Sequence, residues 1–244
     1  MNKKCAVVVL TCDSYSDLWD PFFTLKNRYW ADCPYETYLI TETKKCDYCK
    51  TINVNESIWT KRVREGLKKI KSDYVIILLE DFFIRDKVNN ERIEYCMNNF
   101  DENTAMFNFE KSHDVNDIKS EVEGFNIKTR DSKYKCSSQA AIWDKEKLIE
   151  LLSKDCDPWT WETSEPLKNY KFYINNESEV FTYGKENILF GVYQGKWYKA
   201  DVVPLFKKEN IKIDYSIRGF YKKDSFIKRA IRKIKRLCNK YENK

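Results

Sequence analysis

The chain has very little histidine and glycine for its length. His113 is the sole histidine among 244 residues, and there are six glycines. A single imidazole excludes a multi-histidine metal site and gives little support to a histidine-based catalytic triad. Neither a phosphate-binding P-loop nor the glycine fingerprint of a dinucleotide site is present, which argues against a kinase and a dehydrogenase.

Long hydrophobic runs and linkers are also missing. The first apolar run, residues 6–10, is too short for a signal peptide, and nothing approaches the length of a transmembrane helix. With five prolines and no visible linker or repeat, residues 1–220 are expected to form one α/β domain. Nine cysteines without a disulfide-like framework favour the cytoplasm, and the lone Cys46-x-x-Cys49 pair supports a zinc site weakly.

Positive charge is concentrated at one end of the chain. The net charge is +6, yet residues 221–244 carry ten basic and two acidic side chains, so the remaining body is slightly negative. A body without a basic excess argues against nucleic-acid binding. In residues 222–241, apolar side chains recur at helical spacing among Lys and Arg, which is typical of a basic amphipathic helix on an anionic membrane surface. A helix packed on the domain and a nucleic-acid arm are the alternatives.

Alternating strand and helix patterns predict a mostly parallel central sheet flanked by helices. The expected strands are residues 5–10, 35–40, 75–79, 105–110 and 136–142, with short pieces near 179–183 and 202–205. The expected helices are residues 17–29, 59–71 with Ser57 as cap, 90–99, and 145–152 with Asp144 as cap. Residues 157–162 are expected to form a loop.

The most informative segment is a buried-strand pattern that ends on two acids. Residues 75–79 are continuously apolar, as in a central parallel strand covered on both faces, and Glu80 and Asp81 follow directly. Open α/β sheets bind ligands at the carboxyl ends of their strands, and carboxylates are costly to desolvate unless they are paired or metal-bound. The acids therefore indicate a ligand site, and a strand end that meets solvent is the alternative.

The flanks of these acids carry a family resemblance. Residues 59–83, WTKRVREGLKKIKSDYVIILLEDFF, resemble the part of GT-A glycosyltransferases in which an Arg-bearing helix precedes the strand with the acidic metal motif. That motif is usually Asp-x-Asp, whereas residues 79–82 are LEDF, and this departure weakens the case for metal dependence. A Glu-Asp pair still offers hard oxygen ligands, so the resemblance implies Mn²⁺ or Mg²⁺ at Glu80 and Asp81. The chain looks most like small bacterial enzymes that build surface polysaccharides such as capsule and lipopolysaccharide.

The resemblance places the acceptor side in residues 139–162. It implies that Gln139, Trp159 and Trp161 bind the acceptor, since aromatic rings present flat faces to the C–H faces of sugars. Glu162 would be the general base of an inverting transfer, and Asp81 would be the second catalytic residue, organising the diphosphate. The alternative is that both tryptophans are core anchors and Glu162 is merely exposed.

Donor-side candidates follow the first strands and the first long helix. The expected donor-binding residues are Thr11, Asp13, Ser14, Glu42, Arg62, Glu80 and Lys196. Arg62 is preferred to Arg64 because its spacing from Trp59 and Gly66 predicts a sheet-facing position, and a guanidinium suits a diphosphate. Lys196 follows Gly195 and could close over the diphosphate, although a plain turn is the alternative.

We therefore expect a cytoplasmic, membrane-peripheral hexosyltransferase. The resemblance implies a nucleotide-sugar donor, UDP-linked, and a glycan or lipid-linked glycan acceptor. The alternatives are a sugar nucleotidyltransferase and a noncatalytic protein that binds membrane or RNA. A nucleotidyltransferase would need a glycine- and lysine-rich loop after the first strand, and residues 11–17, TCDSYSD, do not form one.

Overall fold

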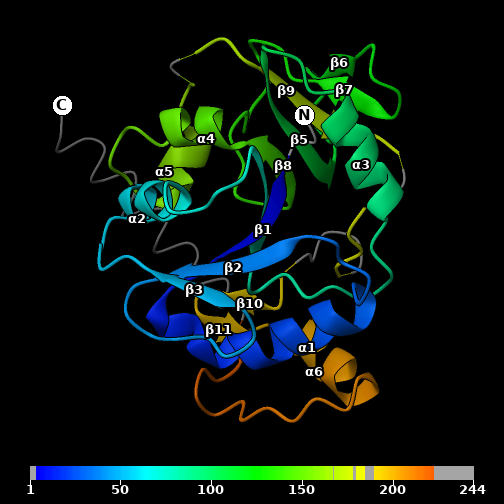
Figure 1. Cartoon of the computed structure of the whole chain (residues 1–244). Coiled ribbons are helices and arrows are strands. Elements are labelled where there is room, and N and C mark those ends of the chain that lie inside the picture. The colour runs from blue at the N-terminus through cyan, green and yellow to red at the C-terminus, as the bar shows by residue number, and fades with distance from the viewer. Residues whose placement is uncertain (1–3, 167, 178–179, 185–189, 223–244) are drawn as a thin grey trace, which may run out of the picture. The chain divides into compact units, whose positions relative to one another are not determined.

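The computed structural model describes residues 4–166, 168–177, 180–184 and 190–222 (Figure 1). The chain divides into two compact units, Met1–Phe190 and Gly191–Lys244. The predicted amphipathic helix lies outside the described residues, apart from Lys222, and the domain boundary expected after residue 220 stays a prediction. Within the described residues, no helix combines the length and the apolar character needed to cross a membrane.

The first unit is built on a nine-stranded mixed sheet with the order β3-β2-β1-β4-β8-β5-β9-β7-β6. The strands are β1 (Cys5–Leu10), β2 (Glu36–Thr41), β3 (Lys50–Asn53), β4 (Tyr74–Leu79), β5 (Thr104–Lys111), β6 (Ile118–Lys119), β7 (Phe125–Ile127), β8 (Ala141–Asp144) and β9 (Lys171–Asn175). The pairings set β7 and β8 antiparallel to the other seven strands of this sheet. A mixed α/β fold with a large, mostly parallel central sheet confirms the predicted fold class.

Helices flank this sheet, and its central strands are buried on both faces. The helices are η1 (Asp13–Leu18, 3₁₀), α1 (Trp19–Tyr29), α2 (Trp59–Leu67), α3 (Asn90–Asn98), α4 (Lys145–Leu151) and α5 (Pro158–Thr163). Figure 1 shows α2, α4 and α5 grouped together beside the sheet. Ala6, Val8 and Leu10 join the core that includes α2 and α4, while Val7 and Val9 are buried on the other face. The continuous apolar run of β1 thus reflects burial on both sides.

Several predicted boundaries and one predicted cap are wrong. The helix expected over 59–71 ends at Leu67, and its N-cap is Ile58, without a side-chain cap, rather than Ser57. The strand expected over 136–142 begins at Ala141. The residues before Ala141 form bends instead, because the loop that contains them turns back toward the start of α5. The strand piece near 179–183 lies partly outside the described residues, and 180–183 are not in a strand.

The segment expected as a loop at 157–162 is the short helix α5. Its N-terminus is defined by Asp157, whose carboxylate accepts hydrogen bonds from the N–H and the hydroxyl of Thr160 at 3.0 and 2.6 Å. Pro158 follows at the first helical position, where its missing N–H has no intrahelical partner to lose. The sequence therefore forms a helix because an N-cap and a proline stand in the order that helix starts favour.

The second unit contains a short hairpin and a helix. Strands β10 (Val192–Tyr193) and β11 (Lys196–Trp197) are joined by Gln194 and Gly195, which both have positive φ. Helix α6 (Lys199–Lys208) includes residues 202–205, which were expected to be strand-like. The buried Trp197 ring contacts Phe206 of this helix with ring centroids 5.7 Å apart, so aromatic packing stabilises the helix here.

Candidate functional site

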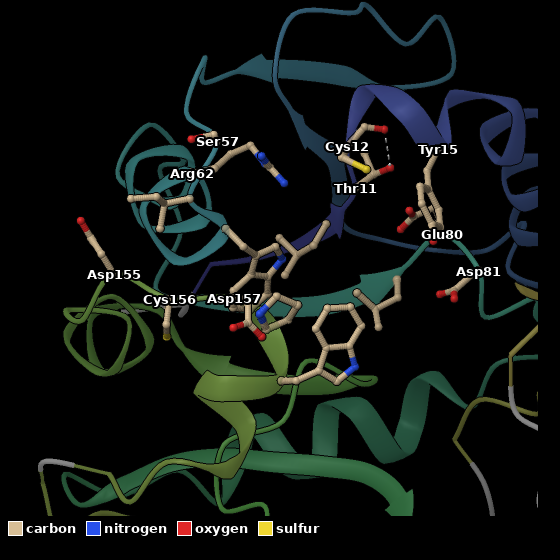
Figure 2. Close-up of a pocket in the computed structure, with 16 residues that line it drawn as sticks. Thr11, Cys12, Tyr15, Ser57, Arg62, Glu80, Asp81, Asp155, Cys156 and Asp157 are labelled. Atoms are coloured by element: carbon tan, nitrogen blue, oxygen red, sulfur yellow. Dashed lines mark hydrogen bonds between the residues drawn. The ribbon is translucent and has the colours of Figure 1, made fainter. Parts of the chain in front are cut away.

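The chain changes direction across the sheet at the boundary between β1 and β4. From β1 it proceeds to β2 and β3 on one side, and it then crosses back to β4 on the other side of β1. Open α/β sheets bind ligands outside the carboxyl ends of the strands at such a switch point. A cleft of about 520 Å³ lies there, lined by Thr11 and Cys12 after β1 and by Glu80 and Asp81 after β4 (Figure 2). We refer to it as the first cleft.

A tight turn places the two acids at the edge of the sheet. The N–H of Phe82 donates to the carbonyl of Leu79 at 3.2 Å, and Glu80 and Asp81 are the two central residues of this turn. Residues 82–84 are buried again, so the chain returns to the core directly after the acids. Glu80 is 6% exposed, and Asp81 is half-buried. The predicted strand-end acids therefore do line a cleft rather than a flat solvent-facing edge.

Arg62 brings a cation to the same cleft from α2, and Figure 2 shows its side chain extending into the hollow. Its Nη1 lies 2.7 Å from Glu42 Oε1 and donates to the carbonyl of Glu56 at 2.8 Å. One turn later, Gly66 allows close packing on β2, because a Cβ there would lie 2.6 Å from Ile40 Cδ1. The glycine thus lets α2 approach the sheet closely enough for Arg62 to reach the end of β2.

Arg64 has a different task on another side of α2. It donates to the carbonyls of Leu152 and Ser153 at 2.6 and 3.2 Å, and it lies 3.3 Å from the Asp155 carboxylate. These bonds tie α2 to the segment after α4. The geometry therefore matches the preference for Arg62 over Arg64 as the residue that faces the cleft.

Reciprocal hydrogen bonds join the ends of β1 and β2. Asp13 accepts from the hydroxyls of Thr41 and Thr43 at 2.8 and 2.5 Å and from the N–H of Lys44 at 3.0 Å. Glu42 in turn accepts from the N–H of Asp13 at 2.5 Å. Burial is the largest single influence on Asp13 and raises its pKa, but the hydrogen bonds together outweigh it and hold the pKa well below its ordinary value. Both acids are engaged in holding the loop, and their donor role stays a prediction.

The two remaining candidates after β1 differ in position. Thr11 is buried and lines the first cleft, and its hydroxyl accepts from Trp19 Nε1 at 3.0 Å and donates to the carbonyl of Cys12 at 3.4 Å. Ser14 is exposed, lies 3.1 Å from the Cys12 sulfur, and does not line the cleft. Tyr15, which we did not predict, does line it.

The two tryptophans of α5 lie on different sides of the helix. Trp159 is 75% exposed and lines the first cleft. Trp161 is 3% exposed, its Nε1 donates to the carbonyl of Leu151 at 3.1 Å, and its ring lies 6.0 Å from that of Trp143. Residues two apart on a helix do not share a face. The prediction that Trp161 binds the acceptor is therefore not supported by its burial, and its ring is a core anchor.

Glu162 and Gln139 line a second cavity, of about 550 Å³, rather than the first cleft. Glu162 accepts hydrogen bonds from the N–H and the hydroxyl of Ser138 at 2.7 and 2.6 Å. Because β8 is antiparallel to β4, with Ile77 opposite Ala141, the start of β8 lies beside the end of β4. The two cavities thus share one edge of the sheet, and the predicted catalytic acids Asp81 and Glu162 belong to different ones.

Some residues of the first cleft gave no usable sequence signal, and one predicted residue lies elsewhere. Asp155 and Cys156 line the cleft together with Asp157 and Pro158, which form the start of α5. The Asp-Pro pair that begins this helix was a signal that we did not use. Lys196 belongs to the second unit, where its Nζ donates to the carbonyl of Arg218 at 3.2 Å. Its donor role therefore stays a prediction.

The acidic pair fits a metal that is shared with a substrate. Among the described residues, no group of three or more His, Cys, Asp and Glu side chains could hold a metal ion. Glu80 and Asp81 supply carboxylates, and Mg²⁺ is commonly held by one or two carboxylates with substrate phosphates completing its shell. The same search gives the Cys46–Cys49 pair no third ligand in the described chain, so a structural zinc site gains no support.

Comparisons with known proteins give a likeness of fold at low identity. No family model matches the chain, and no curated protein matches it. A cytidylyltransferase from Leptospira borgpetersenii serovar Hardjo-bovis is 10% identical with a TM-score of 0.47, covering 92% of this chain and 100% of that one. The bifunctional IspDF from Campylobacter jejuni is 12% identical with a TM-score of 0.46, covering 77% of this chain and 52% of that one.

A further likeness is to TarS from S. aureus, which is 12% identical with a TM-score of 0.38, covering 71% of this chain and 60% of that one. The chain spans about half the length of IspDF and 60% of TarS. TM-scores below 0.5 carry no argument about activity. The mixed α/β fold and the geometry of the two cavities are what this chain itself provides.

Proposed function

We propose that the protein is a transferase that uses a nucleotide-activated substrate, bound in the first cleft. The observation that carries this proposal is the position of the cleft at the β1–β4 switch point, with Arg62, Glu80 and Asp81 on its wall. Strand ends at a switch point are where open α/β sheets bind ligands. A guanidinium provides planar donors for phosphate oxygens, and Trp59 and Trp159 give the cleft aromatic surface for a base or a sugar.

More specifically, we propose a glycosyltransferase with a UDP-linked hexose as donor. Two carboxylates beside a diphosphate would repel it unless a cation lay between them. Glu80 and Asp81 would therefore hold Mn²⁺ or Mg²⁺, which when bound would neutralise charge on the leaving diphosphate. Arg62, paired with Glu42 at 2.7 Å, would keep its remaining donors for the phosphate oxygens.

The second cavity would present the acceptor. In the transfer, an acceptor hydroxyl oxygen forms a bond to the anomeric carbon, the bond from that carbon to the diphosphate breaks, and the hydroxyl proton passes to Glu162. Ser138 holds Glu162 by two hydrogen bonds, so the carboxylate has a fixed orientation with lone pairs left for the proton. Attack from the face opposite the leaving group would invert the anomeric configuration.

The acceptor class and the site of action are proposed from the sequence. We propose a glycan or a lipid-linked glycan of surface-polysaccharide synthesis as acceptor, reached at the inner face of the membrane. The basic residues 221–244 would bind the anionic surface there. Binding of the full chain to anionic and to neutral liposomes at low and high salt tests this, since electrostatic attraction is lost in high salt.

Ligand-induced thermal shifts test the proposed function. Nucleoside diphosphates and nucleotide-sugars are added to the wild-type protein with and without Mn²⁺, because a ligand that binds the native state raises its apparent stability. UDP and UDP-hexoses should raise the Tm, and Arg62→Met should reduce the shift. Lys68→Met is the matched control, since its ammonium pairs with exposed Glu65.

Product analysis then separates sugar transfer from nucleotide transfer. Release of UDP from a UDP-hexose is expected, and release of pyrophosphate from UTP and a sugar 1-phosphate would instead assign a nucleotidyltransferase. The absence of any shift with nucleotides would remove the proposal altogether.

A further inference from the structure

The second cavity has a chemical character of its own. It lies at the carboxyl ends of β5 and β9, beside the start of β8. Its wall carries four carboxylates and three ammonium groups, from Glu110, Asp114, Asp117, Glu162, Lys111, Lys128 and Lys133. The charges nearly cancel, so the cavity as a whole favours neither a strong anion nor a strong cation. Its selectivity must therefore come from individual groups on the wall.

A buried ion pair forms part of that wall. Ile118 of β6 pairs with Ile127 of β7, so Asp117 and Lys128 face each other one position further along the ladder. Their side chains are 0% and 4% exposed, and Lys128 Nζ lies 3.7 Å from Asp117 Oδ2. This separation exceeds a hydrogen bond. Burial lowers the pKa of the Lys128 ammonium, which confirms how poorly the site is solvated.

The pair is incompletely satisfied by the protein. Asp117 Oδ2 accepts from the Ser112 hydroxyl at 2.6 Å, and Lys128 Nζ donates to the carbonyl of Lys133 at 3.0 Å. Asp117 Oδ1 is buried and has no hydrogen-bond partner among the described residues. A buried carboxylate oxygen without a partner is costly, and a buried ion pair adds little net stability by itself. A role in stability alone therefore gives a poor account of this arrangement.

We propose that Asp117 and Lys128 bind a neutral hydroxyl group of a ligand in the second cavity. A hydroxyl is both donor and acceptor, so it can donate to Asp117 Oδ1 and accept from a spare donor of Lys128 Nζ. A phosphate would face Asp117, and an ammonium would face Lys128, so either charged group meets a like charge. The ligand class is a neutral polyhydroxylated compound, a saccharide.

A second wall residue suits the same ligand. Tyr134 lines the cavity and is 57% exposed, although its backbone has φ of +52°, which is unusual for a tyrosine. Its ring offers a flat apolar face against which the C–H face of a pyranose can pack. The identification of this saccharide as the acceptor rests on the proposed function, whereas its binding at Asp117 and Lys128 does not.

Saturation-transfer NMR on the full chain tests the proposal. The probes are the methyl glycosides of glucose, galactose and N-acetylglucosamine, with glucosamine as the cationic probe and glucose 1-phosphate as the anionic probe. At least one neutral glycoside should bind more tightly than both charged probes. The double variant Asp117→Asn with Lys128→Met leaves no unpaired buried charge, and it should weaken glycoside binding about tenfold or more.

Two further variants make the result interpretable. Asp101→Asn is the matched control, because Asp101 pairs with Lys171 at 2.8 Å in an exposed position outside the cavity. Its glycoside binding should equal that of the wild type. Tyr134→Gly removes the ring and relieves the positive φ, so it should fold well and bind several-fold more weakly. If the double variant does not fold, Tyr134→Gly carries the test.

The outcomes separate this inference from the proposed function. Equal glycoside binding by the wild type, the double variant and Tyr134→Gly overturns the inference. So does a failure of every neutral glycoside to bind while UDP still shifts the Tm, a result that leaves the proposed function standing. Glycoside binding that depends on Asp117 and Lys128, without any response to nucleotides, supports the inference and removes the proposed function.

Discussion

The two halves of the central sheet build their binding edges in different ways. In β3-β2-β1-β4 all strands are parallel, so every strand ends at the same edge, and the residues that follow β1 and β4 line the first cleft. In β8-β5-β9-β7-β6 the directions are mixed, and the second cavity is formed by connections that are far apart in the sequence. Parallel strands thus order a site along the sequence, whereas mixed strands bring it together from separate segments.

The two cavities also differ in chemistry. Apolar and aromatic side chains such as Leu10, Leu79 and Trp159 form much of the first cleft, with Arg62 as a cation. The second cavity is rich in charged and amide groups, and a buried ion pair forms part of its wall. A flat base with a diphosphate suits the first, and a hydroxyl-rich ligand suits the second. This difference is the reason for assigning donor and acceptor to separate halves of the sheet.

Glu162→Gln should break the comparison most strongly. As general base in the second cavity, Glu162 should contribute ~10²–10⁴-fold to kcat. Donor affinity should stay near that of the wild type, because Glu162 does not line the first cleft. Initial rates and UDP titrations measure the two effects. Glu165→Gln, which removes an exposed partner of Lys135, should leave both values unchanged. Weakened donor affinity with normal kcat would assign Glu162 to the donor site.

Asp81→Asn probes the other half. It keeps the shape of the side chain and removes its charge, so turnover should fall by ~100-fold through the loss of preorganised electrostatics. Exposed Asp86→Asn, in the same connection, is the control and should have normal activity. Steady-state kinetics with and without a chelator make the measurement. Full activity in the chelator would eliminate the metal, and normal turnover by Asp81→Asn would remove this residue from the site.

Gly66→Ala tests how α2 delivers Arg62 to the first cleft. The new Cβ would lie 2.6 Å from Ile40 Cδ1, and such overpacking costs about 1–3 kcal/mol, partly offset by about 1 kcal/mol of helix propensity. The free energy of unfolding should therefore fall by about 1 kcal/mol in urea titrations, and UDP should bind more weakly. Adding Ile40→Val, which removes Cδ1, should recover part of the loss. A net gain in stability would show that the close approach is not needed.

Asp13→Asn should have the smallest effect, and the effect should depend on pH. The hydrogen bonds to Asp13 hold its folded-state pKa below the unfolded value of about 3.9, so they stabilise the fold at higher pH. The variant should lose about 0.5–1.5 kcal/mol at neutral pH. This difference from the wild type should shrink as the pH falls below about 4, where the unfolded carboxyl takes up its proton. A difference that is constant across acid titrations would contradict the assignment.

Local patterns predicted much of the first half of the sheet. The apolar runs of β1 and β4 specified strands buried on both faces, and Asp144 was correctly expected to cap α4, since its carboxylate accepts from the N–H of Lys147 at 3.0 Å. The burial of Arg62 followed from helical spacing with Gly66. These features depend on neighbours within a turn or a strand, which is the range over which a single sequence carries direct information.

Features that depend on distant pairing were not predicted. Asp117 and Lys128 meet because β6 pairs with β7, and both strands are too short to produce a visible apolar pattern. Trp159 and Trp161 were expected to share one role, but a short helix sends one ring to a cleft and the other into the core. Neither strand order nor strand direction can be derived from composition, and both determine which residues share a cavity.

A crystal structure of the protein with UDP tests the central claim, that the switch-point cleft binds the nucleotide, most directly. The account predicts density for the uridine and diphosphate between Thr11 and Glu80, with the diphosphate within hydrogen-bond distance of the Arg62 guanidinium. UDP bound in the second cavity, or a fully titrated complex whose density lies away from the ends of β1 and β4, would contradict it.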